Sequence, residues 1–290
     1  MAPRMNKQFM NLGPQLCPPE KAQYVVLPVP YEGTVSYMKG TSLGPAAVID
    51  ASTQVEEFDE ELLGDFCGAG VLTLPAVTAA DTPEEMMSRI ALAARDAMKD
   101  KFLLTLGGEH SITAPLVRTA AQRFGEISVL QIDAHADLRD SYEGTIHSHA
   151  AVMRRVLEIT PRIAQVGIRN FSQEEYEQCP QQVKNFITPH VVHTDAAWID
   201  RTLGLLGEQV YVTVDIDGFD PAYVPGTGTP EPGGLDWQEV TSLLRRVCTE
   251  RKVVAADIVE VIPLAGQKVS EFLAARLAYK IIAYTQLKQR

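Results

Sequence analysis

Histidines and aspartates that can bind metal ions recur in two short motifs of this sequence. The first is Asp133-Ala-His135-Ala-Asp137, and the second is Asp215-Ile-Asp217. Alternate residues at the end of a strand point to the same side, so each motif presents its polar side chains on one face. Carboxylates that converge in this way repel one another unless a cation neutralises them. The two motifs therefore predict a metal site.

The number of candidate ligands indicates two metal ions rather than one. With His110, which follows Gly107-Gly-Glu, the two motifs supply more ligands than one ion takes from a protein. Carboxylates with two imidazoles suit Mn²⁺, and Zn²⁺, Co²⁺, Ni²⁺ and Fe²⁺ are alternatives. A structural zinc ion would prefer thiolates, and no cysteine lies near these motifs in the sequence. A lone D-x-D is more often a loop or a helix cap, but the combination with D-x-H-x-D favours a binuclear site.

Such a site predicts hydrolysis at a hard electrophile. Two metal ions about 3.5–4 Å apart typically lower the pKa of a shared water toward neutrality. Phosphate esters, amides and amidines are all candidate substrates on this basis. The sequence contains neither a Walker loop nor G-x-G-x-x-G, so nucleotide chemistry has no support.

The composition excludes several other classes of protein. The chain of 290 residues has a formal net charge of -11, which disfavours nucleic acid as a partner. No apolar run approaches the roughly 20 residues needed to cross a membrane, and the start of the chain lacks the apolar core of a secretory signal. The four cysteines are widely spaced and form no C-x-x-C pair, as expected of free thiols. We therefore predict a cytoplasmic protein.

Strand and helix patterns alternate along the chain, which favours an α/β fold. Helices are predicted to begin after Thr82 and over 236–250 and 269–287. Because the apolar runs are continuous, we expect a parallel sheet covered by helices on both faces, with a closed barrel as the alternative. We divide the chain into an N-terminal arm, 1–20, and a single catalytic domain, 21–290. The predicted strands are 24–29, 101–106, 127–132, 163–168, 210–214 and 253–258.

The polar motifs all follow predicted strands. His110 and Asp133 come after two successive strands, Asp215 ends a later one, and Glu260 follows the last. Ligands of parallel α/β sheets bind at the carboxyl edge, where such loops meet. We therefore expect these four clusters, distant in the sequence, to be neighbours in space.

In this order, the motifs resemble those of the ureohydrolase family, which includes the arginases and agmatinases. The matching segments are Gly107-Gly-Glu-His110-Ser111, Asp133-Ala-His-Ala-Asp137 and the run from Asp215 through Pro-Gly-Thr-Gly-Thr-Pro230 to Gly234. Pro28-Val-Pro-Tyr-Glu-Gly33 and Gly44-Pro45-Ala46 also fit. The resemblance covers nearly the whole chain and is strongest to the agmatinases.

The resemblance implies a three-layer α/β/α fold around a parallel sheet of about eight strands, and two Mn²⁺ ions. It also implies a homo-oligomer, either a trimer or a hexamer. Asp133 and Asp215 are expected to bridge the two ions. The implied ligands are His110, Asp133, Asp137 and Asp215 for one ion, and Asp133, His135, Asp215 and Asp217 for the other.

Further residues receive roles from the same resemblance. Glu260 matches the family glutamate that pairs with the guanidinium, and a carboxylate suits that task because it can accept two parallel hydrogen bonds. His149 matches the proton-shuttling histidine, although His147 is close enough to be the alternative. Thr229 and Arg139 are predicted to contact the substrate. If Arg139 points into the pocket, it favours a guanidino acid because arginine pairs well with carboxylates.

The expected reaction is the hydrolysis of agmatine to putrescine and urea, a step of polyamine biosynthesis. In it, Asp137 passes a proton to the departing amine, and His149 returns the next proton from solvent. A different guanidino compound, such as 4-guanidinobutyrate, is the first alternative. A non-catalytic binding or regulatory subunit and a metal-dependent deacetylase of related architecture are the others.

Overall fold

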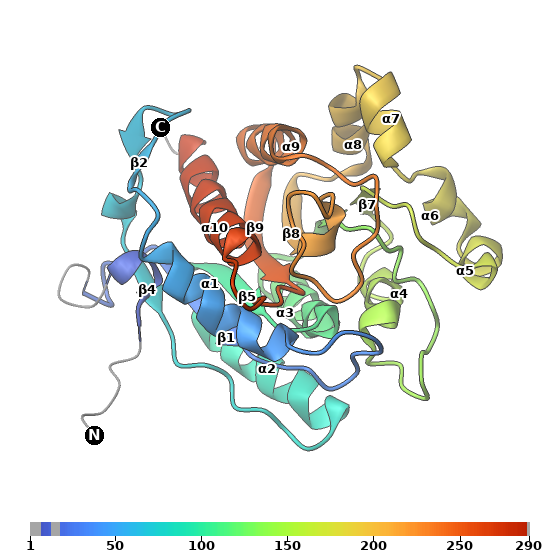
Figure 1. Cartoon of the computed structure of the whole chain (residues 1–290), viewed down its shortest axis with the longest axis horizontal. Helices are drawn as coiled ribbons and strands as arrows, with labels where there is room; N and C mark the ends of the chain where they lie inside the picture. The colour runs from blue at the N-terminus through green and yellow to red at the C-terminus, as the bar shows by residue number, and fades with distance from the viewer. Residues whose placement is uncertain (1–6, 13–17, 289–290) are drawn as a thin grey trace.

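A parallel sheet of seven strands forms the centre of the computed structural model, which describes residues 7–12 and 18–288 (Figure 1). All six pairings in this sheet are parallel. In spatial order the strands are β4 (Val71–Thr73), β1 (Tyr24–Val29), β5 (Phe102–Gly107), β9 (Lys252–Val259), β8 (Gln209–Asp215), β6 (Ser128–Ile132) and β7 (Ile163–Val166).

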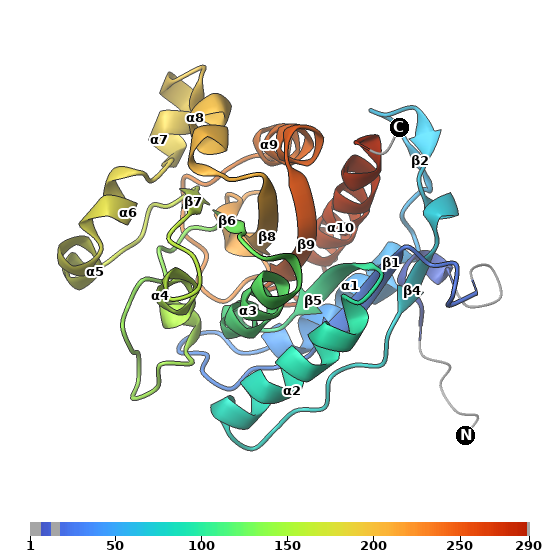
Figure 2. The same ribbon diagram turned by 180° about the vertical axis from the view of Figure 1, so that it is seen from behind.

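Helices cover both faces of the sheet, as Figures 1 and 2 show from opposite sides. One buried apolar cluster joins the sheet to α1 (Gly44–Ser52), α8 (Trp198–Leu205), α9 (Trp237–Glu250) and α10 (Val269–Leu287). A second cluster joins the opposite face to α2 (Pro83–Ala97), α3 (Thr113–Phe124) and α4 (Val152–Leu157). Burying apolar surface in these two clusters is the main force that holds the three layers together. The short helices α5 (Gln173–Gln178), α6 (Pro180–Lys184) and α7 (Pro189–Thr194) lie between β7 and α8 along the chain.

The sheet is open, with β4 and β7 at its edges, so the predicted three-layer fold is confirmed and the closed barrel is wrong. The described residues form seven strands in this sheet, where the resemblance implied about eight. All six strands predicted from apolar runs are present, with ends shifted by one or two residues. The added edge strand, β4, has only three residues and therefore leaves no distinct apolar run.

Helix α2 begins where its capping signals predicted. The Thr82 hydroxyl accepts a hydrogen bond of 3.2 Å from the Glu85 backbone N–H, and Pro83 occupies the first turn. Helix α9 begins with a reciprocal capping box between Asp236 and Glu239.

The described part of the N-terminal arm packs against the domain. Phe9 and Met10, in the 3₁₀ helix η1 (Phe9–Asn11), are buried in the same cluster as α1. Residues 1–6 and 13–17 lie outside the described part, so the division at residue 20 stays a prediction. Cys67, Cys179 and Cys248 are buried free thiols, while Cys17 lies outside the described residues. No helix among the described residues has the length and apolar character to span a bilayer.

Candidate active site

Four adjacent strands at the centre of the sheet carry the polar motifs at their carboxyl ends. In space these strands run β5, β9, β8, β6. His110 follows β5 in the 3₁₀ helix η4 (His110–Ile112), Glu260 follows β9, Asp215 ends β8, and Asp133 follows β6. The structure thus brings the four clusters together at one edge, as the sequence predicted.

His110 lies at the centre of the first group of metal-capable side chains. Its Nδ1 atom is 3.1 Å from Asp133 Oδ2, 3.1 Å from Asp137 Oδ2 and 3.4 Å from Asp215 Oδ2. All four side chains are buried. The structure thus brings together the four side chains predicted to bind one ion, and their role as ligands stays a prediction.

His135 belongs to the second group. Its Nδ1 atom lies 3.0 Å from Asp217 Oδ2 and 3.7 Å from Asp133 Oδ1. Asp217 is in the 3₁₀ helix η6 (Ile216–Gly218), directly after β8. Asp133 contributes an oxygen to each group, which is the arrangement that a bridging ligand requires. The bridging role of Asp215 stays a prediction, because its oxygen groups with His110 and not with His135.

The electrostatics of this cluster fit divalent cations. His110 Nδ1 is buried and has no hydrogen-bond partner among the described residues. Burial alone would lower the pKa of His110, but Asp133, Asp137 and Asp215 overcome this effect and raise it well above its ordinary value. Burial, with repulsion from Asp133, raises the pKa of Asp137 to about 7. The carboxylates therefore require positive charge at this position, and two metal ions would supply it without protonating the histidines.

Side chains within the strands orient the metal-capable groups. His110 Nε2 lies 2.9 Å from Thr213 Oγ1, and Thr213 donates a 2.6 Å hydrogen bond to Asp257 Oδ1, so Nδ1 is left facing the carboxylates. Gln131 Nε2 donates to Asp133 Oδ2 at 2.6 Å. These hydrogen bonds were not predicted from the sequence. The signal was the spacing, because Thr213 and Gln131 each lie two residues before a candidate ligand and hence on the same side of the strand.

Glu260 reaches the same cavity from the end of β9. Its Oε1 atom accepts a 2.7 Å hydrogen bond from the His110 backbone N–H. The backbone φ of Glu260 is +64° and that of Asp137 is +54°, a left-handed conformation that is uncommon for residues other than glycine. Burial, then repulsion from Glu109, raises the pKa of Glu260 well above its ordinary value. No lysine or arginine forms an ion pair with this carboxyl group among residues 7–12 and 18–288.

His149 lines the cavity and His147 does not. His149 begins the 3₁₀ helix η5 (His149–Ala151), and its ring meets that of Tyr142 edge-on with centroids 5.9 Å apart. Its backbone N–H donates to the Thr34 hydroxyl at 3.2 Å. The geometry therefore favours His149 over His147 as the histidine that can exchange protons with a bound ligand.

Both remaining predicted residues face the cavity. The Arg139 guanidinium lies 5.3 Å from the centroid of the Tyr142 ring, and Thr229 Oγ1 donates to Asp217 Oδ2 at 3.4 Å. Other residues that line the cavity were not predicted from the sequence, because they come from loops without a recognisable motif. They include residues 35–38, Asn170 and Phe171.

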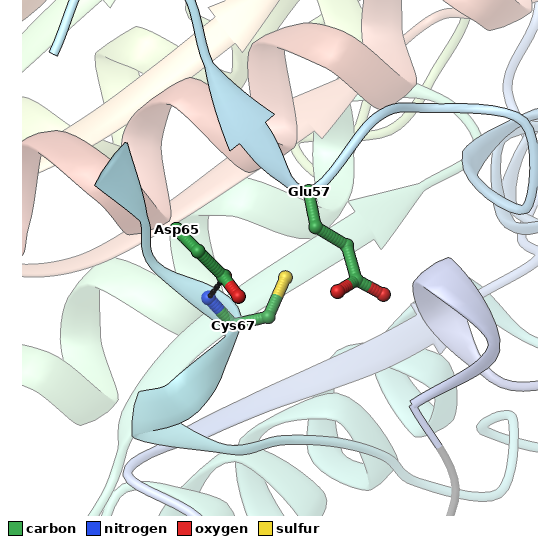
Figure 3. A group of neighbouring side chains, drawn as sticks. All are labelled: Glu57, Asp65 and Cys67. Atoms are coloured by element: carbon green, nitrogen blue, oxygen red, sulfur yellow. Dashed lines mark hydrogen bonds between the residues drawn. The ribbon is translucent and has the colours of Figure 1, made fainter. Parts of the chain in front are cut away.

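A third group of metal-capable side chains lies away from this cavity, beside the β2 (Phe58–Asp59) and β3 (Gly64–Asp65) hairpin (Figure 3). It consists of Glu57, Asp65 and Cys67. Asp65 Oδ1 already accepts a 2.7 Å hydrogen bond from the Cys67 backbone N–H. Burial, with repulsion from Asp65, raises the pKa of the Cys67 thiol to about 12, which disfavours the thiolate that binds metals. These contacts argue against a metal centre in this group, which lies where the chain enters and leaves the hairpin.

Comparison with known proteins agrees with this geometry. The model of the arginase family matches residues 22–283. The chain belongs to the arginase family. As a member of the arginase family it is a hydrolase, and its curated relatives include ureohydrolases and agmatinases.

Three known proteins show how similar this chain is to other members of the arginase family. It is 40% identical over 281 residues to the N(1)-aminopropylagmatine ureohydrolase of Synechocystis sp., a match that covers 93% of this chain and 91% of the relative. The agmatine ureohydrolase of Thermoplasma volcanium superposes with a TM-score of 0.85 at 34% identity over 93% of both chains. Proclavaminate amidino hydrolase from Streptomyces clavuligerus superposes with a TM-score of 0.87 at 28% identity over 98% of both chains.

Proposed function

We propose that this ureohydrolase acts on agmatine or its N(1)-aminopropyl derivative, releasing urea and the corresponding amine, with two Mn²⁺ ions as cofactors. The relatives named for these two substrates are similar over nearly the whole chain. Both compounds carry a guanidinium at one end and an amine at the other. Putrescine formation, a cytoplasmic location and assembly into trimers or hexamers belong to the same proposal.

The buried carboxylate of Glu260 is the main reason to propose a guanidinium substrate. It is 8% exposed, it lines the cavity beside the carboxylate cluster, and it is not needed as a metal ligand. A buried carboxylate without a cation is unfavourable, and a planar guanidinium would give it two parallel charge-assisted hydrogen bonds. Binding the substrate would therefore offset the burial, and then the repulsion from Glu109, that raise the pKa of Glu260.

The proposed metal ligands are the six predicted residues, and the ions would supply an activated water as the nucleophile. Glu260 holds the guanidinium nitrogens and thereby fixes the position of the central carbon. The bond that breaks joins the guanidino carbon to the nitrogen that carries the alkyl chain. Urea keeps the oxygen of water, and Asp137 transfers a proton to the departing amine. His149 then exchanges a proton with solvent. The proposed ligands are His110, Asp133, His135, Asp137, Asp215 and Asp217.

A guanidino acid is the second candidate, and Arg139 is the reason for it. Arg139 lines the cavity and stacks on Tyr142, and no ion pair holds it among the described residues. An arginine in this position can pair with a carboxylate at the far end of a substrate. The likeness to proclavaminate amidino hydrolase is consistent with this alternative.

A urea-release assay of the manganese-loaded enzyme separates the candidates. The substrates are agmatine, N(1)-aminopropylagmatine, arginine, 4-guanidinobutyrate and 3-guanidinopropionate. We expect the highest kcat/KM for one of the first two, and we expect Arg139→Ala to change it by less than about threefold. A preference for 4-guanidinobutyrate that Arg139→Ala lowers by about 10- to 150-fold, the worth of a hydrogen bond to a charged group, would overturn the proposal in favour of the guanidino acid.

The same assay tests the two alternatives from other classes. A metal-loaded protein that is inert toward every guanidino compound would be a binding or regulatory subunit. Release of acetate from an acetylated amine, without urea from any guanidino compound, would identify a deacetylase.

A further inference from the structure

A buried carboxylate next to the active site has no role in the reaction proposed above. Glu109 lies between Gly108 and His110, and its side chain is completely buried. No cationic side chain pairs with it among the described residues. Three donors satisfy it instead: the Thr34 backbone N–H at 2.6 Å, the Thr34 hydroxyl at 2.7 Å and the Ser111 hydroxyl at 2.5 Å. Two of the three come from a single residue that is 75 positions away in the sequence.

Thr34 belongs to the loop 32–42, which forms one wall of the cavity through residues 35–38. The other end of this loop is also held by a carboxylate. Glu32 Oε2 accepts hydrogen bonds from the Gly40 backbone N–H at 2.8 Å and the Ser42 backbone N–H at 3.0 Å. The hydrogen bonds of the buried Glu109 and the half-buried Glu32 therefore fix a loop that has no helix or strand of its own between residues 32 and 40.

The backbone of Tyr31, just before the loop, packs tightly against that of Gly108 and Glu109. The Glu109 N–H donates to the Tyr31 carbonyl at 2.9 Å, and a Cβ atom at Gly108 would lie 2.0 Å from that carbonyl oxygen. The start of the loop is therefore pressed against the segment that carries His110. A shift of Thr34 would therefore displace Glu109 and, with it, the neighbouring His110.

Thr34 also contacts His149. Its hydroxyl accepts the His149 backbone N–H at 3.2 Å and lies 3.4 Å from the His149 ring Nδ1, while Ser36 Oγ is 3.5 Å from Nε2. The Thr34 hydroxyl donates to Glu109, so its lone pairs are directed at His149. The chain of contacts runs from Glu109 through Thr34 to the ring that faces the cavity.

We propose that Glu109 is a positioning residue that acts through Thr34, holding the loop 32–42 as a cavity wall and setting the orientation of His149. This inference rests on the proposed function, because it assigns a purpose to the orientation of His149. It predicts two separable effects. The position of the loop depends on the hydrogen bond from the Thr34 backbone N–H to Glu109. The orientation of His149 depends on the Thr34 hydroxyl.

Thr34→Val tests the hydroxyl, since valine keeps the branched shape and the backbone N–H. We expect kcat to fall by about 10- to 100-fold, within the range of a misaligned proton-transfer group, while KM and metal content change by less than about threefold. Thr34→Ser restores the hydroxyl and should return kcat to within about threefold of the wild type. Thr194→Val, at an exposed threonine of α7, is the matched control and should leave kcat unchanged.

Glu109→Gln tests the grip on the loop. Glutamine presents only one oxygen, so its amide N–H₂ meets either the Thr34 backbone N–H, which cannot accept, or the Thr34 and Ser111 hydroxyls. Those hydroxyls would have to turn from donating to accepting, and Thr34 would then lose the direction in which its lone pairs face His149. We expect faster hydrogen–deuterium exchange across residues 32–42 of the manganese-loaded protein, measured by mass spectrometry, together with a lower kcat and a higher KM. Metal content measured on the same sample separates this effect from damage at His110.

Unchanged exchange in Glu109→Gln would overturn the proposal. So would a wild-type kcat in Thr34→Val, or a failure of Thr34→Ser to recover activity. If the wild-type enzyme released no urea from any guanidino compound, the proposed function would fail, and the exchange experiment alone would decide for or against the positioning role.

Discussion

At the scale of single residues, the surroundings of His149 determine how activity should depend on pH. Burial lowers the pKa of this imidazole from its ordinary value of 6.5, although Glu109 opposes the effect. A lowered pKa means that the ring gains its proton only at a lower pH than a free histidine, so His149 is neutral at pH 7. A neutral ring beside the cavity can accept a proton from solvent and pass it on.

We therefore predict that kcat of the wild-type enzyme has an ionisation below pH 6.5 that belongs to His149. His149→Gln should lower kcat by about 100-fold or more and remove this ionisation, because the residue can no longer carry the proton. The measurement is a pH profile of kcat with metal content determined at each pH. His147→Gln is the control, since His147 does not line the cavity. The role of His149 is refuted if its replacement leaves the profile intact, or if His147→Gln is the variant that loses the ionisation.

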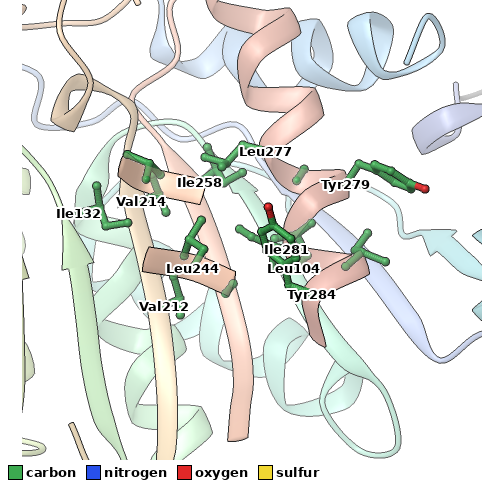
Figure 4. Packing of buried hydrophobic residues seen from close by; sticks show 14 of the residues in the cluster. Leu104, Ile132, Val212, Val214, Leu244, Ile258, Leu277, Tyr279, Ile281 and Tyr284 are labelled. Atoms are coloured by element: carbon green, nitrogen blue, oxygen red, sulfur yellow. The ribbon is translucent and has the colours of Figure 1, made fainter. Parts of the chain in front are cut away.

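At the scale of elements, helix α10 has two different tasks. Leu277 and Ile281 lie in the apolar cluster with Ile258 of β9 and Leu104 of β5 (Figure 4). On the side toward the hairpin, α10 carries Lys280, which is only 1% exposed. Its Nζ atom lies 2.9 Å from Asp59 Oδ2 and 3.1 Å from carboxyl oxygens of Glu60 and Glu61. This cluster anchors the β2–β3 hairpin to the helix.

Lys280→Met should therefore destabilise the fold strongly. Asp59 is completely buried, and within the described part of the chain removing the lysine leaves its charge with Arg276, at 3.5 Å, as the one remaining cationic partner. We expect the free energy of unfolding to fall by about 3–5 kcal/mol, the range for breaking a buried ion pair.

Urea-induced unfolding followed by circular dichroism measures this change. Lys99→Met, which removes a lysine whose side chain is 74% exposed and lies 4.0 Å from the 66% exposed Asp96, should cost at most about 1 kcal/mol. Equal effects of the two substitutions would contradict an anchoring role for Lys280.

At the scale of the whole molecule, the sequence was most informative about strands and least informative about their order. Continuous apolar runs identified the buried strands. The meeting of the motifs at one edge followed from the rule that ligands bind at the carboxyl ends of parallel strands. The adjacency of β5, β9, β8 and β6 could not be predicted from their positions in the chain, because crossover helices and side-chain packing decide it. Edge strand β4 was missed since three residues show no periodicity.

The candidate site shows the same division. The convergence of the six candidate ligands was predictable because their spacing has a chemical meaning, whereas the role of Glu260 was suggested only by the resemblance to the ureohydrolases. The contact of Thr34 with Glu109 was not, because it joins a loop without a motif to a residue 75 positions away. Local patterns do not encode such long-range contacts.

Metal binding should also stabilise the whole molecule. Asp133, Asp137, Asp215 and Asp217 are all buried within one cluster, so removal of the ions leaves their repulsion uncompensated. An ion that binds only the folded state at 100 times its Kd contributes about 2.7 kcal/mol. For a chain of this size, this corresponds to a Tm that is about 5 °C or more higher. Chelation should lower the Tm by this amount, and manganese should restore it in a concentration-dependent way.

Asp133→Ala provides the decisive comparison, because Asp133 contributes an oxygen to both groups of ligands. Calorimetry of this variant should show a Tm that does not respond to manganese, and the variant should neither retain metal nor release urea. Asp195→Ala, an equivalent change at a residue that does not line the cavity, should keep the full metal response, because the Asp195 side chain contacts Arg201 and the Ala197 backbone N–H rather than any candidate ligand. Full activity of a verified metal-free Asp133→Ala protein, or a wild-type Tm that chelation does not change, would mean that the carboxylate cluster holds no functional metal.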